Sequence, residues 1–225
     1  MLVKTGRGTA WEAETGRHRR FGPVRHRKDA DMTHAAMRII HDEHHALAAM
    51  LSSLGLLLAE HRRHGTLPDF ALLRAMLFYV DEFPERLHHT KESALLFPRL
   101  RIRSPELRDV LDRLDRDHDR GEKSIRDLEH ALLAFEIVGE PRREAFEQSL
   151  KRYVDFYLEH MRIEETEVLP AAARLLTEED WAELDAAFSE NRDPLTGHPP
   201  EDEYRGLFSR IVGMAPAPIG LGPAL

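Results

Sequence analysis

Most of the chain repeats apolar residues with the 3.6-residue period of an α-helix, from about residue 33 onward. Four long stretches carry this period, at about 33–64, 68–101, 104–139 and from 141 to about 175, and nothing reads as a strand. The connections between them are short and contain glycine or proline. Long helices joined by short connections pack antiparallel, so the sequence predicts an all-α fold, an up-down-up-down four-helix bundle.

Local signals indicate where these helices begin, end or break. Gly65 and Gly139 each follow a periodic stretch, as glycine does at helix C-termini. Ser104, followed by a proline, is typical of the residue that caps a helix N-terminus. Pro84 lies inside the second stretch and should kink or interrupt it, because proline lacks the amide proton that a helix needs.

Three regions of the chain differ in composition. The segment 1–30 contains eight Lys or Arg against three acidic side chains, so we expect residues 1–31 to form a basic, disordered arm. Residues 32–175 form the predicted bundle. Residues 176–225 should add C-terminal helices and a Pro/Gly tail that pack on it, with one helix from Thr177 to about Asn191 and a shorter one at about 203–212.

One histidine in each bundle helix occupies a position that the apolar stripe assigns to the core: His44, His88, His118 and His160. A single buried imidazole is usually satisfied by a hydrogen bond, but four without a shared purpose cost too much desolvation. His44 and His88 lie equally far along the chain from the turn near residue 66, and His118 and His160 lie equally far from the turn near residue 139. Antiparallel packing therefore brings all four to one level of the bundle.

Two carboxylates accompany these histidines. Glu92 follows His88 by four positions and Glu164 follows His160 by four, and side chains at this spacing share a helix face. Both segments read H-x3-E-x5-P, so the bundle resembles two copies of one helical hairpin. Two carboxylates facing each other in a core repel unless cations lie between them, which predicts a site for two bridged metal ions.

The chain has no cysteine, so any metal must be held by nitrogen and oxygen ligands. Imidazole with carboxylate suits iron or manganese, with zinc as a further candidate. The ferritin pattern needs Glu-x-x-His on two helices. Glu85 with His88 fits it once, but Tyr157 stands at the matching position before His160, so we reject that pattern.

At these residues the sequence resembles the hemerythrin / HHE cation-binding family over about residues 34–172. The resemblance is carried by the segments Glu43-His44-His45, His88-His89-Thr90-Lys91-Glu92 with Leu96-Phe97-Pro98, Asp117-His118-Asp119 and His160 with Glu164. It implies a hemerythrin-like bundle that binds two iron ions. It also implies that His44 and His88 bind one iron, that His118 and His160 bind the other, and that Glu92 and Glu164 bridge them.

The chain departs from the oxygen-carrying members of that family at one position. Those proteins have a second histidine four positions after the one on the third helix, where this chain has Glu122. Glu122 is either a ligand or leaves an open coordination position, which would favour reactions with dioxygen, peroxide or nitric oxide. His41, His45 and His89 are further candidate ligands or lie beside the site or at the surface, and Tyr157 either lines a ligand pocket or packs in the core.

Composition limits the partners. The chain holds 32 Lys and Arg and 40 Asp and Glu, and the segment 1–30 takes eight of the basic side chains but only three of the acidic ones. The remainder is therefore strongly acidic, which argues against nucleic acid as the main partner. No apolar run approaches the length of a membrane span or a signal peptide, so we expect a cytoplasmic protein, monomeric or homodimeric, without a membrane partner.

Three functions remain open from the sequence. The first is a module that binds or senses dioxygen, nitric oxide or iron at the di-iron site. The second is a di-iron enzyme that reduces peroxide or dioxygen. The third is a structural bundle without metal.

Overall fold

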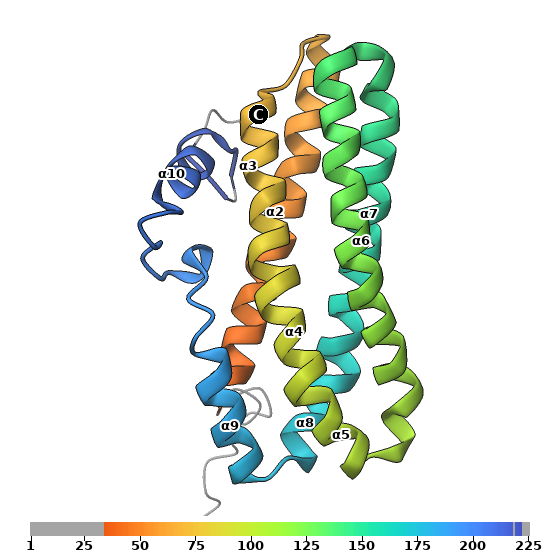
Figure 1. Ribbon diagram of the computed structural model, residues 1–225, viewed down its shortest axis with the longest axis vertical. Helices are drawn as coiled ribbons and strands as arrows, with labels where there is room; N and C mark the ends of the chain where they lie inside the picture. The colour runs from red at the N-terminus through yellow and green to blue at the C-terminus, as the bar shows by residue number, and fades with distance from the viewer. Residues whose placement is uncertain (1–33, 218, 222–225) are drawn as a thin grey trace, which may run out of the picture.

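The computed structural model describes residues 34–217 and 219–221. The predicted basic arm, residues 1–31, lies outside the described residues. Within the described part, the chain runs up and down four times through helical segments and forms no strand (Figure 1). The prediction of an all-α bundle is therefore confirmed.

The first and third runs are long α-helices, whereas the second and fourth are interrupted. The first is α2 (Ala35–His64), and the third is a short 3-10 turn, η3 (Pro105–Leu107), followed by α6 (Arg108–Val138). The second consists of α3 (Phe70–Val80), η1 (Asp81–His88), α4 (His89–Lys91), η2 (Glu92–Leu96) and α5 (Phe97–Arg103). The fourth consists of η4 (Glu140–Arg142), α7 (Arg143–Ile163), η5 (Glu164–Val168) and α8 (Leu169–Leu175).

Three of these segments, η1, η2 and η5, are π-helical turns, and proline accounts for them. Proline has no amide proton, and its ring clashes with the carbonyl four positions before it. Pro84 lies within η1, and Pro98 and Pro170 each follow a π segment by two positions. The amide before Pro98 bonds to Glu92 O, and the amide before Pro170 bonds to Glu164 O, five positions back in each case. The H-x3-E-x5-P repeat thus starts a π turn at each paired carboxylate.

The helix ends follow the local sequence signals with one exception. Gly65 and Gly139 end α2 and α6 with φ of 63° and 82°, a conformation that glycine adopts without strain. The hydroxyl of Thr177 accepts the amide of Asp180, whose carboxylate accepts the amide of Thr177, so a capping box starts the helix that was predicted from Thr177. Ser104, in contrast, precedes a 3-10 turn, and its side chain does not cap that turn.

Two apolar clusters fill the bundle, one toward each end. The first contains Leu54, Leu73, Leu132 and Phe146 among others, and the second is built around residues such as Phe97. Along the first three runs, the core histidine separates residues of one cluster from residues of the other, and on the fourth run the change falls between Met161 and Ile163, next to His160. The histidines therefore occupy a polar layer between two apolar layers.

The C-terminal part of the chain packs along the outside of the bundle (Figure 1). Helix α9 (Glu178–Phe188) contacts α2 and buries Trp181, Leu184 and Phe188. After the turn η6 (Pro194–Thr196), helix α10 (Arg205–Met214) contacts α3 and buries Phe208 and Ile211. Of the helices that the structure describes, none combines the length and the apolar character needed to span a bilayer.

Candidate metal centre

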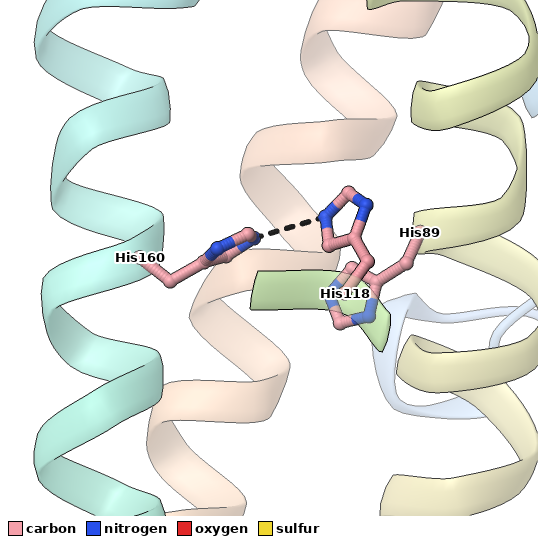
Figure 2. A group of neighbouring side chains, drawn as sticks. All are labelled: His89, His118 and His160. Atoms are coloured by element: carbon pink, nitrogen blue, oxygen red, sulfur yellow. Dashed lines mark hydrogen bonds between the residues drawn. The ribbon is translucent and has the colours of Figure 1, made fainter. Parts of the chain in front are cut away.

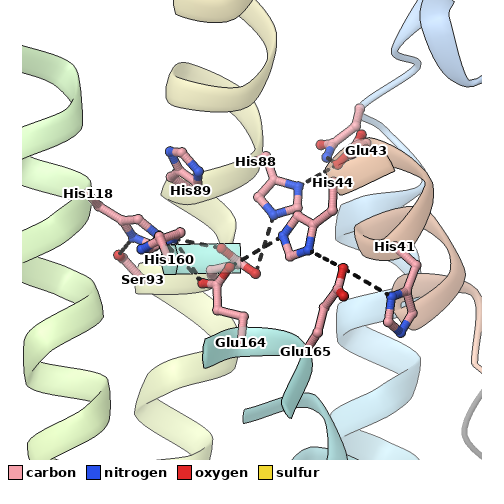
Figure 3. A network of polar contacts seen from close by, with 12 residues as sticks. His41, Glu43, His44, His88, His89, Ser93, His118, His160, Glu164 and Glu165 are labelled. Carbon is pink, nitrogen blue, oxygen red and sulfur yellow. Dashed lines mark hydrogen bonds and ion pairs between the residues drawn. The ribbon is translucent and has the colours of Figure 1, made fainter. Parts of the chain in front are cut away.

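Six predicted ligands meet in the polar layer, and each comes from a defined point of the bundle. His44 lies on α2, His118 on α6 and His160 on α7, while His88 ends η1. Glu92 and Glu164 are the first residues of η2 and η5. All six are buried, and the two glutamates have no exposed surface at all. Figure 3 shows the imidazoles converging on the carboxylates.

Half of the layer is formed by His44 and His88. His44 Nε2 lies 3.3 Å from Glu164 Oε2, and His88 Nε2 lies 3.3 Å from Glu92 Oε1. The two imidazole rings are 5.1 Å apart between centroids. Ligand atoms of His44, His88 and Glu92 all lie within 4.8 Å of one another, a spacing that one cation can span.

The other half is formed by His118 and His160, whose Nε2 atoms are 3.1 Å apart. His160 Nε2 lies 3.2 Å from Glu164 Oε1, and His118 Nε2 lies 3.5 Å from Glu92 Oε2. These two histidines and both glutamates form a group with ligand atoms within 4.8 Å of one another. Each glutamate therefore directs one oxygen toward each half, as a carboxylate between two cations does.

The hydrogen bonding of this layer is incomplete. Both oxygens of Glu92 and both oxygens of Glu164 are buried without a hydrogen-bond partner, and so are the Nε2 atoms of His44 and His88. The contacts of about 3.3 Å between them have the separation of an ion pair but lack hydrogen-bond geometry. Buried polar atoms left this way are costly, and cations bound between them would remove the cost. The residues present therefore fit a metal site with imidazole and carboxylate ligands.

The outward-facing nitrogen of each histidine in the first half is held by an acidic residue. His44 Nδ1 lies 3.1 Å from Glu165 Oε1, and His88 Nδ1 lies 2.6 Å from Glu43 Oε2. Glu43 is itself fixed by the side-chain amide of Asn191, at 2.9 Å. An acceptor at Nδ1 places the proton on that nitrogen and leaves the lone pair of Nε2 for a metal.

The second half repeats this arrangement. His118 Nδ1 lies 2.8 Å from Ser93 Oγ, which donates a hydrogen bond of 2.7 Å to Asp115. His160 Nδ1 faces Asp117 Oδ2 at the longer distance of 3.9 Å. All four imidazoles therefore turn Nδ1 toward an acceptor on the outside of the polar layer and Nε2 toward its centre.

None of these outer acceptors was predicted from the sequence. They are Glu43, Ser93, Asp115, Asp117 and Glu165. The available signal was adjacency, because Glu43, Asp117 and Glu165 each neighbour a predicted ligand in the chain.

Opposite charges act on one another within this layer. Burial would lower the pKa of His160, but the charge of Glu164 and the nearby carboxylate of Asp117 raise it to about 10. Burial likewise opposes the charged form of His44, but contacts with Glu164 and Glu165 raise its pKa above the usual value. Burial alone would raise the pKa of Glu164, but His160, His118 and His44 hold it well below its usual value. Imidazoles and carboxylates in this layer thus favour each other's charged forms.

Glu122 does not join the cluster. Its side chain is 56% exposed and pairs with Arg126 on the surface of α6. The buried face of α6 runs through His118, Gly121 and Ile125, so Glu122 lies one position beyond it. His45 is exposed, and His41 is partly exposed, with its Nδ1 3.6 Å from Glu165.

His89 and Tyr157 lie beside the cluster. His89 is buried, and its Nδ1 lies 3.2 Å from Glu85 Oε2. A ligand atom of His89 lies within 4.8 Å of ligand atoms of both His118 and His160, and Figure 2 shows the three rings together. Tyr157 is fully buried in the first apolar cluster and donates a hydrogen bond to Glu85. Its hydroxyl therefore faces Glu85 in the core.

A surface cavity of about 530 Å³ lies against the second half of the layer. It is bounded by residues of η1, α4, η2 and α6, namely Glu85, Arg86, His89, Thr90, Ser93, Ala94, His118, Asp119 and Glu122. The cavity gives a small polar molecule a route from solvent to His89 and His118.

Comparison with known proteins gives one match. A family model described as hemerythrin HHE cation binding domain matches residues 35–172. The matched range contains the four core histidines and both buried glutamates. No curated protein and no solved structure matches the chain.

Proposed function

This chain belongs to the hemerythrin HHE cation-binding family, and from that premise we propose that it is a non-haem di-iron protein. It binds or senses dioxygen, nitric oxide or iron at the polar layer. One observation carries the proposal. The four oxygens of Glu92 and Glu164 are buried without hydrogen bonds, and the Nε2 atoms of four histidines surround them. Protein cores retain such groups when a cation compensates them.

In this proposal the two halves of the layer each hold one iron. His44 and His88 bind the first, and His118 and His160 bind the second. Glu92 and Glu164 bridge the pair, which is supported by the way each glutamate offers a different oxygen to each half. Nitrogen and oxygen ligands without thiolate suit iron, and manganese or zinc are possible substitutes.

The protein's own contribution is orientation and exclusion of water. When bound, an iron pair supplies reversible binding of small ligands and one-electron chemistry. The acceptors at Nδ1 of His44, His88 and His118 fix these three rings in the orientation that points Nε2 inward. The apolar clusters above and below the layer keep water from the carboxylates, which remain fully buried.

A second candidate function, reduction of peroxide or dioxygen, is favoured by the cavity beside His118. Its lining includes the carboxylate of Glu85 and the imidazole of His89. Polar groups of this kind can bind a small oxygenated substrate and exchange protons with it. We rank the binding function first. The cluster itself consists of candidate metal ligands, and Glu85 and His89, which can exchange protons, lie beside it.

Metal analysis followed by mixing with oxygen tests both functions. Purified protein from metal-replete medium should contain two iron atoms per chain, with manganese or zinc counted in parallel. Stopped-flow spectra of the reduced protein mixed with oxygen should show a stable charge-transfer band if the site binds oxygen. Rapid turnover of added peroxide, without a stable band, would favour the enzyme. Protein without iron, manganese or zinc would contradict both and leave a structural bundle.

A further inference from the structure

We propose that His89 supplies a third imidazole to the cation held by His118 and His160. The inference rests on the proposed di-iron function and makes it more specific. His89 lies on α4, one position after the predicted ligand His88, so the second bundle helix would provide ligands to both halves of the layer. The two halves would then differ, with two imidazoles at one cation and three at the other.

The position of His89 carries the proposal. Its side chain is buried, and one of its ring nitrogens lies within 4.8 Å of ligand nitrogens of His118 and His160. The ring centroid of His89 is 4.4 Å from that of His118 and 5.5 Å from that of His160 (Figure 2). The three rings come from three different helical runs, so a cation among them would be held from three sides.

His89 is also anchored in the same way as the other core histidines. Its Nδ1 lies 3.2 Å from Glu85 Oε2. Glu85 is held on its other oxygen by Tyr153, at 2.7 Å, and by Tyr157. A buried carboxylate fixed by two tyrosines thus faces Nδ1 of His89, as Glu43 faces Nδ1 of His88. A carboxylate at Nδ1 orients an imidazole for metal binding through Nε2.

The proposed ligand also fits the place that Glu122 leaves. Glu122 points to the surface and pairs with Arg126, so α6 supplies only His118 to this half. His89 lies beside the same half from α4, and both His89 and His118 line the surface cavity. A small molecule that enters this cavity would then reach the cation that has three imidazole ligands. The cation of His44 and His88 would have two imidazole ligands and therefore the more open coordination position.

Packing is the competing explanation for His89. Its ring is parallel to that of Tyr157, 5.5 Å away, and nearly parallel to that of His118. A residue that only packs there contributes nothing to the metal, so its replacement would leave metal binding unchanged. The two explanations differ in what they predict for the iron environments.

Mössbauer spectroscopy of iron-loaded protein decides between them. In wild-type protein we expect two different iron environments in equal amounts. In His89→Gln we expect the two environments to become alike, and chelator competition should show at least about tenfold weaker binding of the second iron. His45→Gln is the matched control, because His45 is also next to a ligand histidine but is exposed, and it should match wild type.

The outcomes separate this inference from the proposed function. Wild-type protein that binds no metal contradicts the di-iron proposal itself. Wild-type protein that binds two irons in one common environment overturns the role of His89, and so does a His89→Gln protein with the wild-type spectrum and affinity. If His89→Gln does not fold, as judged by circular dichroism, the wild-type spectrum alone decides.

Discussion

At the scale of single residues, the orientation of the candidate ligands depends on side chains that lie outside the centre of the site. An acceptor at Nδ1 fixes the rings of His44, His88 and His118. Ser93 is the one neutral group among these acceptors, and its hydroxyl donates a hydrogen bond to Asp115. The orientation of His118 therefore depends on a hydroxyl that lies outside the ligand set.

Replacing Ser93 with alanine should weaken metal binding without unfolding the protein. The substitution removes the acceptor at His118 Nδ1 and leaves its Nε2 in place, so the ring loses its fixed orientation. We expect iron affinity to fall by about 10- to 100-fold, measured by competition with a chelator. Ser149→Ala is the control, since that exposed hydroxyl bonds only to its own helix. Equal affinities for Ser93→Ala and wild type would contradict the role of Ser93.

Asp193 gives a prediction about pH. It is buried, accepts the hydroxyl of Tyr79 at 2.6 Å and accepts the amide of Leu195 at 2.8 Å. Burial raises the pKa of Asp193 to about 6, above its usual value of 3.8. Because the pKa of Asp193 is higher in the folded than in the unfolded state, its protonated form stabilises the fold. This contribution is fully present at pH values below the unfolded-state pKa of 3.8 and is lost as pH rises through about 6.

Asp193→Asn should therefore become more stable relative to wild type as pH rises from 4 to 7. Asparagine stays neutral; its Oδ1 can accept the amide of Leu195, and its Nδ2 can donate to the hydroxyl of Tyr79, which reverses the direction of that hydrogen bond. The shift of about two pKa units limits the gain in unfolding free energy to about 3 kcal/mol. Urea unfolding of both metal-free proteins at the two pH values measures it, and other titrating groups cancel in the comparison. The exposed control Asp202→Asn should change by less than about 0.5 kcal/mol, and a pH-independent difference for Asp193→Asn would refute the prediction.

At the scale of helices, local signals predicted most of the fold. The period of apolar residues and Gly65 predicted a first helix over about 33–64, and the structure has it at Ala35–His64. The short C-terminal helix lies two positions later than predicted, at Arg205–Met214, and ends just before the proline-rich tail. Pro84 predicted an interruption, but the π turns at η2 and η5 were not foreseen, because they depend on a hydrogen bond to a residue five positions back.

Contacts between helices were harder to predict than the helices. Glu122 was considered as a ligand because it lies four positions after His118, but the buried face of α6 turns through Gly121 instead. Asn191 holds Glu43 across 148 positions of sequence, and no periodic pattern relates two residues so far apart. The core histidines could be identified from the sequence because each one interrupts an apolar stripe. The polar residues around them interrupt no such stripe, so the sequence gives no sign that they face the site.

Gly121 tests how closely α6 and α7 must approach. A β-carbon at this position would lie 1.7 Å from the hydroxyl oxygen of Tyr157 and 3.0 Å from Glu85 Oε1. Gly121→Ala must therefore displace the ring of Tyr157 or separate the helices, and we expect a loss of about 1–3 kcal/mol in unfolding free energy. Tyr157→Phe in the same protein should recover part of that loss, because the nearest atom is then absent.

Gly55→Ala is the matched control for this prediction. Gly55 lies in α2, and no neighbouring atom would fall within 4 Å of an added β-carbon. Alanine there should be neutral or stabilise the protein by up to about 1 kcal/mol, because it favours the helix. Thermal or urea unfolding of both variants measures the contrast. Equal effects of the two substitutions would show that the contact at Gly121 does not constrain the bundle.

At the scale of the whole molecule, the polar layer that holds the candidate metal site separates the core of the bundle into two apolar clusters. Two apolar clusters stabilise the ends, and between them lies a layer in which buried carboxylates lack hydrogen bonds. The C-terminal segment is tied to that layer as well, because Asn191 contacts Glu43 and Lys91 bonds to Ala187 O at 2.7 Å. Any ligand that compensates the layer should therefore stabilise the entire chain.

Removing the metal should lower the melting temperature of the whole protein. A cation that binds only the folded state at 100 times its dissociation constant adds about 2.7 kcal/mol. For a chain of this size that corresponds to a shift of roughly 5–10 °C for each occupied site. Calorimetry before and after treatment with a chelator, followed by addition of iron, should show a fall in the melting temperature and then its recovery.

Glu164→Ala is the control variant. It should bind neither iron, because Glu164 contacts both halves, and its melting temperature should be unchanged by chelator and by iron. If chelation left the wild-type melting temperature unchanged while removing bound iron, the buried carboxylates would be compensated by protons alone, and the coupling between site and fold would be refuted.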